Sequence, residues 1–257
     1  MYNLDLITKA ALPIAKFKDD MESFHNFSQD FDNWIFKSNF KVQGLPKDSY
    51  IVSGITDAFN QTYAIYNKIG IFEGEYPYHE VVLPKKRLTK NLKAADCIIV
   101  SHPFSADGMS AHEKLAYADT FNKPIFVDCA FFGICSNVNF DFTLYKNIHT
   151  VAFSLSKTFG TGYYRVGKIY TVDTYPVSVY KEWDYQLLSS AKIHYDLINT
   201  LGPDDTFKKY RQKQIEICNE LGIIPSDTVI FGLDHNKKYN KFKRGYVNRL
   251  CITHYLK

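Results

Sequence analysis

Long apolar runs are absent from this chain of 257 residues. None approaches the length of about 20 residues that a membrane-spanning helix requires. The first residues, MYNLDLITKAALPIAKFKDD, also lack the basic segment and the sustained apolar core of a signal peptide. We therefore expect no transmembrane helix, no signal peptide and a cytoplasmic location.

Paired cysteines are missing as well. The five cysteines are an odd number, and none belongs to a Cys-x-x-Cys pair. Disulfide frameworks and structural zinc sites both rely on such pairing. We therefore expect reduced thiols, with no disulfide and no metal site, at Cys97, Cys129, Cys135, Cys218 and Cys251.

A large excess of charge of one sign is also lacking. The formal net charge is +4, and the lysines are spread along the chain apart from the cluster KYNKFKR at residues 238–244. Such a modest cluster is typical of a solvated face. These features predict no nucleic-acid partner and no membrane partner.

Apolar residues are plentiful, at 46% of the chain, and support a large buried core. Segments 49–54, 96–101, 124–133 and 149–156 read as strands, the later ones buried on both faces. Helices are expected between them. One covers residues 55–70 and stops at Gly70, and another covers residues 110–122, where Ser110 and Glu113 form a capping box. This alternation predicts a three-layer α/β/α arrangement around a mainly parallel sheet.

A change of pattern near residue 180 predicts a domain boundary. Two long amphipathic helices follow, in segments 185–202 and 204–222, each closed by a glycine. Strands are expected in segments 226–234 and 245–256. We therefore predict a large domain at residues 1–180 and a small α+β domain at residues 181–257.

Polar residues follow several of the predicted strands, at the edge of a parallel sheet where ligands bind. Lys157 comes after an apolar run, where its amine either snorkels into water or is held in a dry pocket as a nucleophile. Asp128 ends a very apolar strand and needs a cation, a protonated ring nitrogen or a salt bridge. The N–H groups of Gly54, Ile55 and Thr56 fit either a plain turn or a phosphate site.

Taken together, these groups match one cofactor. Pyridoxal phosphate carries an aldehyde, a protonatable ring nitrogen and a phosphate, and needs a lysine, a carboxylate, an aromatic face and an anion site. Each of these four requirements has a candidate in this sequence.

Five segments carry a resemblance to a known family. SLSKTFGTGYYRVG (154–167) matches a Ser-x-x-Lys…Arg-x-Gly signature, VDCAFFG (127–133) resembles an Asp-x-Ala-Tyr segment, and SHPFSADG (101–108) resembles an Asn-Pro-Thr-Gly segment. EYPYHE (75–80) is similar to the stretch with a ring-stacking aromatic and a histidine, and NRLCIT (248–253) to the strand that binds the substrate carboxylate. These segments, and their order along the chain, resemble those of the fold-type I pyridoxal-phosphate enzymes, most closely the class I/II aminotransferases.

The resemblance implies roles for the reacting groups. Lys157 would form a Schiff base with the cofactor and move a proton between the substrate and the cofactor. Asp128 would keep the pyridine nitrogen protonated, His79 would orient Asp128, and Tyr76 would stack on the ring as part of the catalytic site. Arg249 would bind the α-carboxylate of the substrate as a two-pronged pair.

The same resemblance implies an anion site. The phosphate would be held by the Ser154 and Arg165 side chains together with the amides of Gly54, Ile55 and Thr56, and Ser156 would be a neighbour. The implied activity is transfer of an amino group between an amino acid and a 2-oxo acid, in a homodimer.

Three departures from the family pattern leave other outcomes open. Ser105 stands where an asparagine is usual and Phe131 where a tyrosine is usual, and both positions contact the cofactor's phenolic oxygen in the family. The region before Lys157 is also short for the family. The alternatives are decarboxylation, elimination, racemisation or cyclisation with the same cofactor, or a non-catalytic descendant that binds a ligand or a protein.

Overall fold

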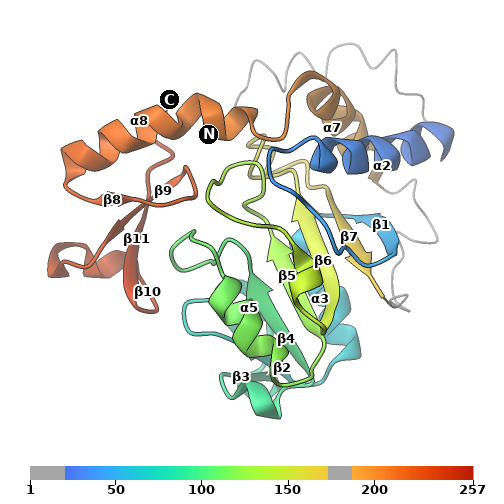
Figure 1. Cartoon of the computed structure of the whole chain (residues 1–257), viewed down its shortest axis with the longest axis horizontal. Helices are drawn as coiled ribbons and strands as arrows, with labels where there is room; N and C mark the ends of the chain where they lie inside the picture. The colour runs from blue at the N-terminus through green and yellow to red at the C-terminus, as the bar shows by residue number, and fades with distance from the viewer. Residues whose placement is uncertain (1–20, 173–186, 257) are drawn as a thin grey trace.

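A seven-stranded sheet forms the centre of the larger part of the molecule (Figure 1). The computed structural model describes residues 21–172 and 187–256. In spatial order the strands are β1 (Asp48–Val52), β7 (Gly167–Thr171), β6 (Ile148–Ser154), β5 (Ile125–Cys129), β4 (Cys97–Ser101), β2 (Ile69–Ile71) and β3 (Leu88–Thr89). The run from β6 to β3 is parallel, whereas β7 is antiparallel to both of its neighbours. The predicted mainly parallel sheet is therefore confirmed.

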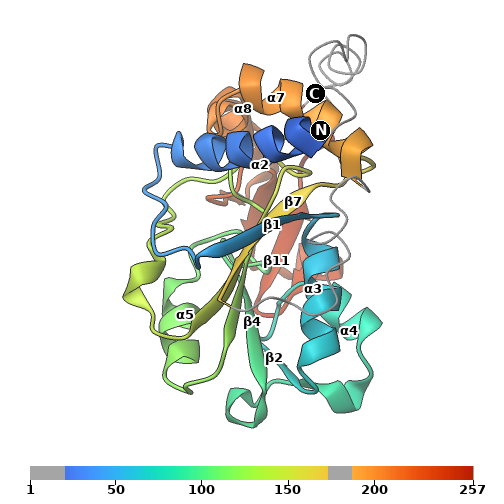
Figure 2. The same ribbon diagram turned by 90° about the vertical axis from the view of Figure 1, so that its right-hand side faces the viewer.

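Helices cover both faces of this sheet (Figure 2). On one face α3 (Ile55–Ile65) packs on alternate strand residues, among them Cys97 and Ile99. On the other face α5 (His112–Asp119) and α2 (Met21–Phe36) pack on the intervening residues, among them Ile98 and Val100. Because successive side chains of a strand point to opposite faces, an apolar run such as CIIVS serves both cores. This arrangement is the predicted three-layer α/β/α fold.

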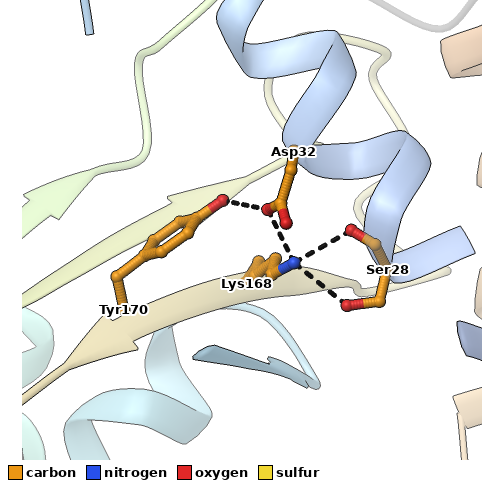
Figure 3. Close-up of polar contacts among 4 residues, drawn as sticks. All are labelled: Ser28, Asp32, Lys168 and Tyr170. Atoms are coloured by element: carbon orange, nitrogen blue, oxygen red, sulfur yellow. Dashed lines mark hydrogen bonds and ion pairs between the residues drawn. The ribbon is translucent and has the colours of Figure 1, made fainter. Parts of the chain in front are cut away.

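A buried lysine joins α2 to the sheet (Figure 3). Lys168 of β7 is 1% exposed, and its Nζ lies 2.6 Å from Asp32 Oδ1. The same Nζ donates to the carbonyl oxygen of Ser28 over 2.9 Å and to its hydroxyl over 3.0 Å, and the Tyr170 hydroxyl donates to Asp32. A buried ammonium group is tolerated only when it is paired and hydrogen-bonded, and these contacts meet that requirement.

A second, four-stranded antiparallel sheet forms the smaller part of the molecule (Figure 1). Its order is β10 (Lys243–Arg244), β11 (Val247–Cys251), β9 (Phe231–Asp234) and β8 (Ile224–Pro225). An apolar cluster joins it to α8 (Asp205–Leu221), whose end is capped by Gly222 in the left-handed region as expected. The small α+β part predicted from the sequence is present, whereas the predicted boundary near residue 180 lies outside the described residues.

Two further helices and several 3-10 turns complete the described chain. Helix α7 (Leu188–Thr200) packs against α2, and α4 (Tyr78–Val82) follows β2. The remaining elements are 3-10 turns at Lys85–Arg87, Leu92–Ala94, Phe142–Leu144 and Lys237–Phe242. None of the helices described is long and apolar enough to cross a membrane.

Two predicted helix boundaries are wrong, and tertiary contacts explain both. Helix α3 ends at Ile65, and Gly70 lies inside β2, where a Cβ atom would come within 2.8 Å of the Ala95 Cβ. Helix α5 begins at His112 rather than at a capping box, because the backbone N–H of Ala111 donates to the buried His102 ring over 3.1 Å. The Ser110 hydroxyl has no hydrogen-bond partner in the part of the chain that the structure describes.

Candidate active site

A cavity of about 150 Å³ lies at the carboxyl ends of the central strands of the large sheet. The register explains its position, because Val52 of β1 and Ser154 of β6 both pair with Gly167 of β7, so these two strands end at the same level on either side of β7. Most of the site residues predicted from the sequence line this cavity: Ile55, Thr56, Tyr76, Ser105, Asp128, Ser154, Lys157 and Arg165.

One wall of the cavity is suited to an anion. Gly54 has φ +74° and ψ 173°, a backbone conformation open essentially to glycine alone, and a Cβ atom there would lie 3.2 Å from the Arg165 guanidinium. Arg165 Nη2 donates to the Thr56 hydroxyl over 2.8 Å. The amides of Ile55 and Thr56 belong to the first turn of α3, where N–H groups have no carbonyl partner within the helix. The Gly54 N–H instead donates to the carbonyl of Val52 over 2.7 Å.

Ser154 borders the same wall. Its hydroxyl accepts the Ser156 N–H over 3.2 Å and is 3.5 Å from the Val166 carbonyl oxygen. The hydroxyl thus fixes the turn that follows β6 and that leads to Lys157.

A buried carboxyl group forms the floor of the cavity. Asp128, in the penultimate position of β5, is 5% exposed, and its Oδ1 accepts the Ala130 N–H over 2.8 Å. Burial raises the pKa of Asp128 to about 7, although the charge of Lys157 acts in the opposite direction. A carboxyl group in this state would be stabilised in its ionised form by a cation placed in the cavity.

Lys157 reaches the cavity from the turn beyond β6. Its side chain is exposed, in contrast to the dry pocket considered from the sequence, because β6 ends three residues earlier at Ser154. Lys157 also lines a second cavity of about 190 Å³, together with Ile230, Cys251 and Thr253. The lysine therefore stands between the two cavities.

The histidine predicted to orient Asp128 lies behind the cavity rather than in its wall. The His79 ring is fully buried, its Nδ1 is 2.6 Å from the Tyr63 hydroxyl, and burial lowers its pKa to about 3. Its Nε2 has no hydrogen-bond partner among the described residues. The structure thus contains no hydrogen bond from His79 to Asp128.

Aromatic side chains form the remaining walls. Tyr76 is exposed on its outer side and lies nearly parallel to Tyr78, at a ring separation of 6.0 Å. Phe131 also lines the cavity and packs edge-on against Phe231 of the small sheet at 5.2 Å. Phe131 brings no hydroxyl group to this wall, as its departure from the family pattern anticipates.

Arg249 connects the small sheet with the site. It lies on β11, and its guanidinium donates to the carbonyl oxygen of Ser105 and sits 4.2 Å from the Phe231 ring centroid. Burial lowers its pKa to about 10, and its Nε has no hydrogen-bond partner within residues 21–172 and 187–256. Arg249 does not itself line the cavity but contacts a residue that does.

Two polar residues near the cavity were not predicted. Ser101 ends β4 and lines the cavity, and Glu75 precedes Tyr76 and is only 5% exposed. The rule that selected Asp128, a polar residue at the end of a buried strand, would also have selected Ser101. The signal for Glu75 was its place between Gly74 and Tyr76, where an acidic residue borders a predicted aromatic wall.

Comparisons with solved structures identify the fold. No family model matches the sequence. A histidinol-phosphate aminotransferase from Clostridium acetobutylicum is 15% identical and has a TM-score of 0.63, with 98% of this chain and 91% of that chain covered. A protein from Clostridium difficile 630, described as a pyridoxal-phosphate-bound putative aminotransferase, is 13% identical and has a TM-score of 0.68, with 98% of this chain and 85% of that chain covered.

An enzyme with a different activity has a similar structure. A pyridoxal-phosphate-bound C–S lyase from Staphylococcus hominis is 13% identical, has a TM-score of 0.64 and covers 91% of this chain and 72% of its own. Structural similarity at these sequence identities defines the fold. It confirms the predicted fold, which is that of the fold-type I pyridoxal-phosphate enzymes.

A local sequence match points to another protein. A glucose-1-phosphate adenylyltransferase from Pasteurella multocida is 39% identical over 72 residues. The match covers 27% of this chain and spans 16% of that protein's length. The sequence similarity is therefore limited to a short segment of each protein.

Proposed function

We propose that this chain is a pyridoxal-phosphate-dependent aminotransferase that moves an amino group between an amino acid and a 2-oxo acid. One observation carries the proposal: Asp128 and Lys157 line the same cavity as the Arg165–Thr56 pair. The solved structures with this fold, some of them bound to pyridoxal phosphate, support the choice of cofactor.

The residues present fit the three reactive parts of that cofactor. The glycine backbone at Gly54 leaves room for the Arg165 guanidinium, which with the α3 amides suits a phosphate. Asp128 offers a carboxyl group for a protonated ring nitrogen, and Lys157 offers an amine. When bound, pyridoxal phosphate supplies an aldehyde that combines with amines and a ring that accepts the electron pair released at the substrate's Cα.

Each of these residues then has a task. Lys157 Nζ would bind the aldehyde in the resting enzyme and, once released from it, would carry the proton removed from Cα. Asp128 would be ionised next to the ring nitrogen and hold the proton on that atom. Tyr76 would cover the outer side of the cavity and help to exclude water, and Arg249 would bind the substrate's α-carboxylate near Ser105.

The contributions of Gly54 and His79 are narrower. Gly54 would act through the space it leaves, because its own N–H is bonded to Val52. We propose His79 as a positioning residue for Asp128 from the second layer, since its neutral ring is packed behind the cavity with Nε2 unpaired.

We also propose a cytoplasmic homodimer that acts on small molecules. The exposure of Lys157 and Arg165, which both line the cavity, supports the homodimer, because a second subunit placed there would screen the site from water. Analytical ultracentrifugation tests this, and a monomer at micromolar concentration would contradict it.

One observation supports a different reaction at Cα as the alternative to aminotransfer. Phe131 lines the cavity without a hydroxyl group, and a C–S lyase has this fold, so decarboxylation, elimination, racemisation or cyclisation are the alternative outcomes. The test is to mix the cofactor-loaded protein with a panel of amino acids and follow its visible spectrum. Conversion to the pyridoxamine form supports aminotransfer. Release of carbon dioxide or ammonia without that conversion supports the alternative.

A further inference from the structure

A second buried carboxyl group lies next to Asp128. Ser101, the last residue of β4, is the register partner of Asp128 on β5, and Glu75 contacts Ser101 from the loop after β2. The Ser101 N–H donates to Glu75 Oε2 over 3.0 Å, and the Ser101 hydroxyl is hydrogen-bonded to Oε1. The N–H of Tyr76 donates to Oε1 over 2.9 Å. Glu75 therefore forms hydrogen bonds with two residues of the cavity wall, Ser101 and Tyr76.

The surroundings of Glu75 contain little to neutralise a charge. Among the described residues it forms no ion pair, and its charged neighbours are Asp128 on β5 and Lys114 on α5. Lys114 lies over the rings of Phe104 and Tyr246, at 4.3 and 5.5 Å, rather than against the carboxyl group. Burial and the charge of Asp128 raise the pKa of Glu75 to about 8, against the hydrogen bonds from Ser101 and Tyr76 and the charge of Lys114.

We propose that Glu75 is a positioning residue that stays protonated in the folded protein: its neutral carboxyl group holds Tyr76 and Ser101 in the cavity wall and leaves Asp128 as the acid that ionises when a cation is placed there. This inference rests on the proposed function, which gives Tyr76 and Asp128 their tasks.

The hydrogen bonds are consistent with a neutral acid. A protonated carboxyl group has one donor, which the hydroxyl oxygen of Ser101 can accept, and its two oxygens still accept the N–H groups of Ser101 and Tyr76. An ionised Glu75 would place two like charges beneath one cavity, and like charges disfavour ionisation of both. A glutamine would make the same set of contacts without a charge.

The test uses three variants. Glu75→Gln preserves the contacts, Glu75→Ala removes them, and Glu73→Gln is a matched control in the same loop, since the Glu73 side chain is 63% exposed and paired with Lys90. The first measurement is the infrared carbonyl band of a protonated carboxylic acid at pH 7 in the cofactor-free protein. We expect the band in wild type and in Glu73→Gln, with the Glu75 contribution missing in Glu75→Gln.

The second measurement is the dissociation constant for pyridoxal phosphate. We expect Glu75→Gln to stay within about twofold of wild type and Glu75→Ala to bind about tenfold more weakly, which corresponds to one lost hydrogen bond to the wall. An identical infrared band in wild type and Glu75→Gln would overturn the protonated state. Equal affinity in wild type and Glu75→Ala would overturn the positioning role.

The failure of the two proposals can be told apart. A wild-type protein that does not bind pyridoxal phosphate contradicts the proposed function, whatever the infrared spectrum shows. Normal binding by wild type together with an ionised Glu75 contradicts only this inference. If Glu75→Ala does not fold, a Glu75→Gln protein that binds pyridoxal phosphate more than tenfold more weakly than wild type contradicts it as well.

Discussion

Arg165 donates a hydrogen bond to the Thr56 hydroxyl over 2.8 Å, which joins two segments 109 residues apart in the sequence. This contact brings the turn after β6 to the start of α3 and builds the anion wall of the cavity. Its guanidinium passes over Gly54, whose backbone leaves it the necessary space.

The Arg165 side chain is expected to hold the cofactor's phosphate. A charge-assisted hydrogen bond contributes about 1.5–3 kcal/mol, so Arg165→Ala should weaken pyridoxal phosphate binding by about 10- to 100-fold. Equilibrium titration of the cofactor's absorbance measures this. Lys146→Ala, an exposed site near the opposite end of β6, serves as the control. Equal affinities for wild type and Arg165→Ala would remove this residue from the site.

Gly54 should tolerate no side chain. Gly54→Ala forces a residue with a Cβ into φ +74° and ψ 173° and places that atom 3.2 Å from the Arg165 guanidinium. Strain of this kind costs about 1–3 kcal/mol, so the melting temperature should fall. Gly162→Ala is the matched control for stability, because a Cβ there meets no atom within 4 Å. Similar melting temperatures for the two variants would contradict the strained conformation.

Asp128 should lower the stability of the cofactor-free protein at neutral and higher pH. Burial raises its pKa from the ordinary value of 3.8 to about 7, so the folded state binds more protons than the unfolded state between these values. The free energy of unfolding therefore falls as the pH rises through this window, by up to about 4 kcal/mol from this group alone. Asp128→Asn should be more stable than wild type at pH 8, by a margin that shrinks towards pH 5.

The same substitution should impair cofactor binding and catalysis. Asp128→Asn cannot supply the negative charge next to the ring nitrogen, so pyridoxal phosphate should bind more weakly and turnover should fall by at least about 100-fold. Urea unfolding at several pH values and cofactor titration measure the two effects. A variant that is less stable than wild type at pH 8 would contradict the assigned pKa, and unchanged turnover would contradict the catalytic role.

The Lys168–Asp32 pair should respond unequally to the loss of either partner. Asp32→Ala leaves a nearly fully buried ammonium group without its counter-ion and should cost about 3–5 kcal/mol of stability. Lys168→Met should cost less, because the Asp32 side chain is 32% exposed and can be hydrated. Urea unfolding of both variants measures the difference. The reverse order would show that the lysine is not buried as described.

The parts of the site that the sequence predicted are those set by chain-local patterns. Asp128 and Ser154 occupy the ends of apolar strands, and the turn that carries Lys157 follows directly from β6. Parallel strands bring their carboxyl ends to one edge of the sheet, so these residues meet there whatever the loops do.

The features that the sequence analysis predicted wrongly or missed depend on contacts between distant segments. Position 70 needs a glycine because Ala95 packs closely against it, and α5 begins where it does because His102 binds the N–H of Ala111. The sequence patterns that predict where helices start and stop include neither Ala95 nor His102. Glu75 is significant only because β4 places Ser101 beside it. A sequence pattern read in short windows carries no record of these partners.

Borohydride reduction of the cofactor-loaded protein, followed by peptide mapping, tests the central claim most directly. The claim is that Lys157 Nζ is the amine that binds the cofactor's aldehyde. It predicts a pyridoxyl group fixed on the peptide that contains Lys157 in wild type, and none on that peptide in Lys157→Ala, which should still bind the cofactor non-covalently through Arg165 and Asp128. A pyridoxyl group on a different lysine of the wild-type protein, or unchanged turnover in Lys157→Ala, would contradict it.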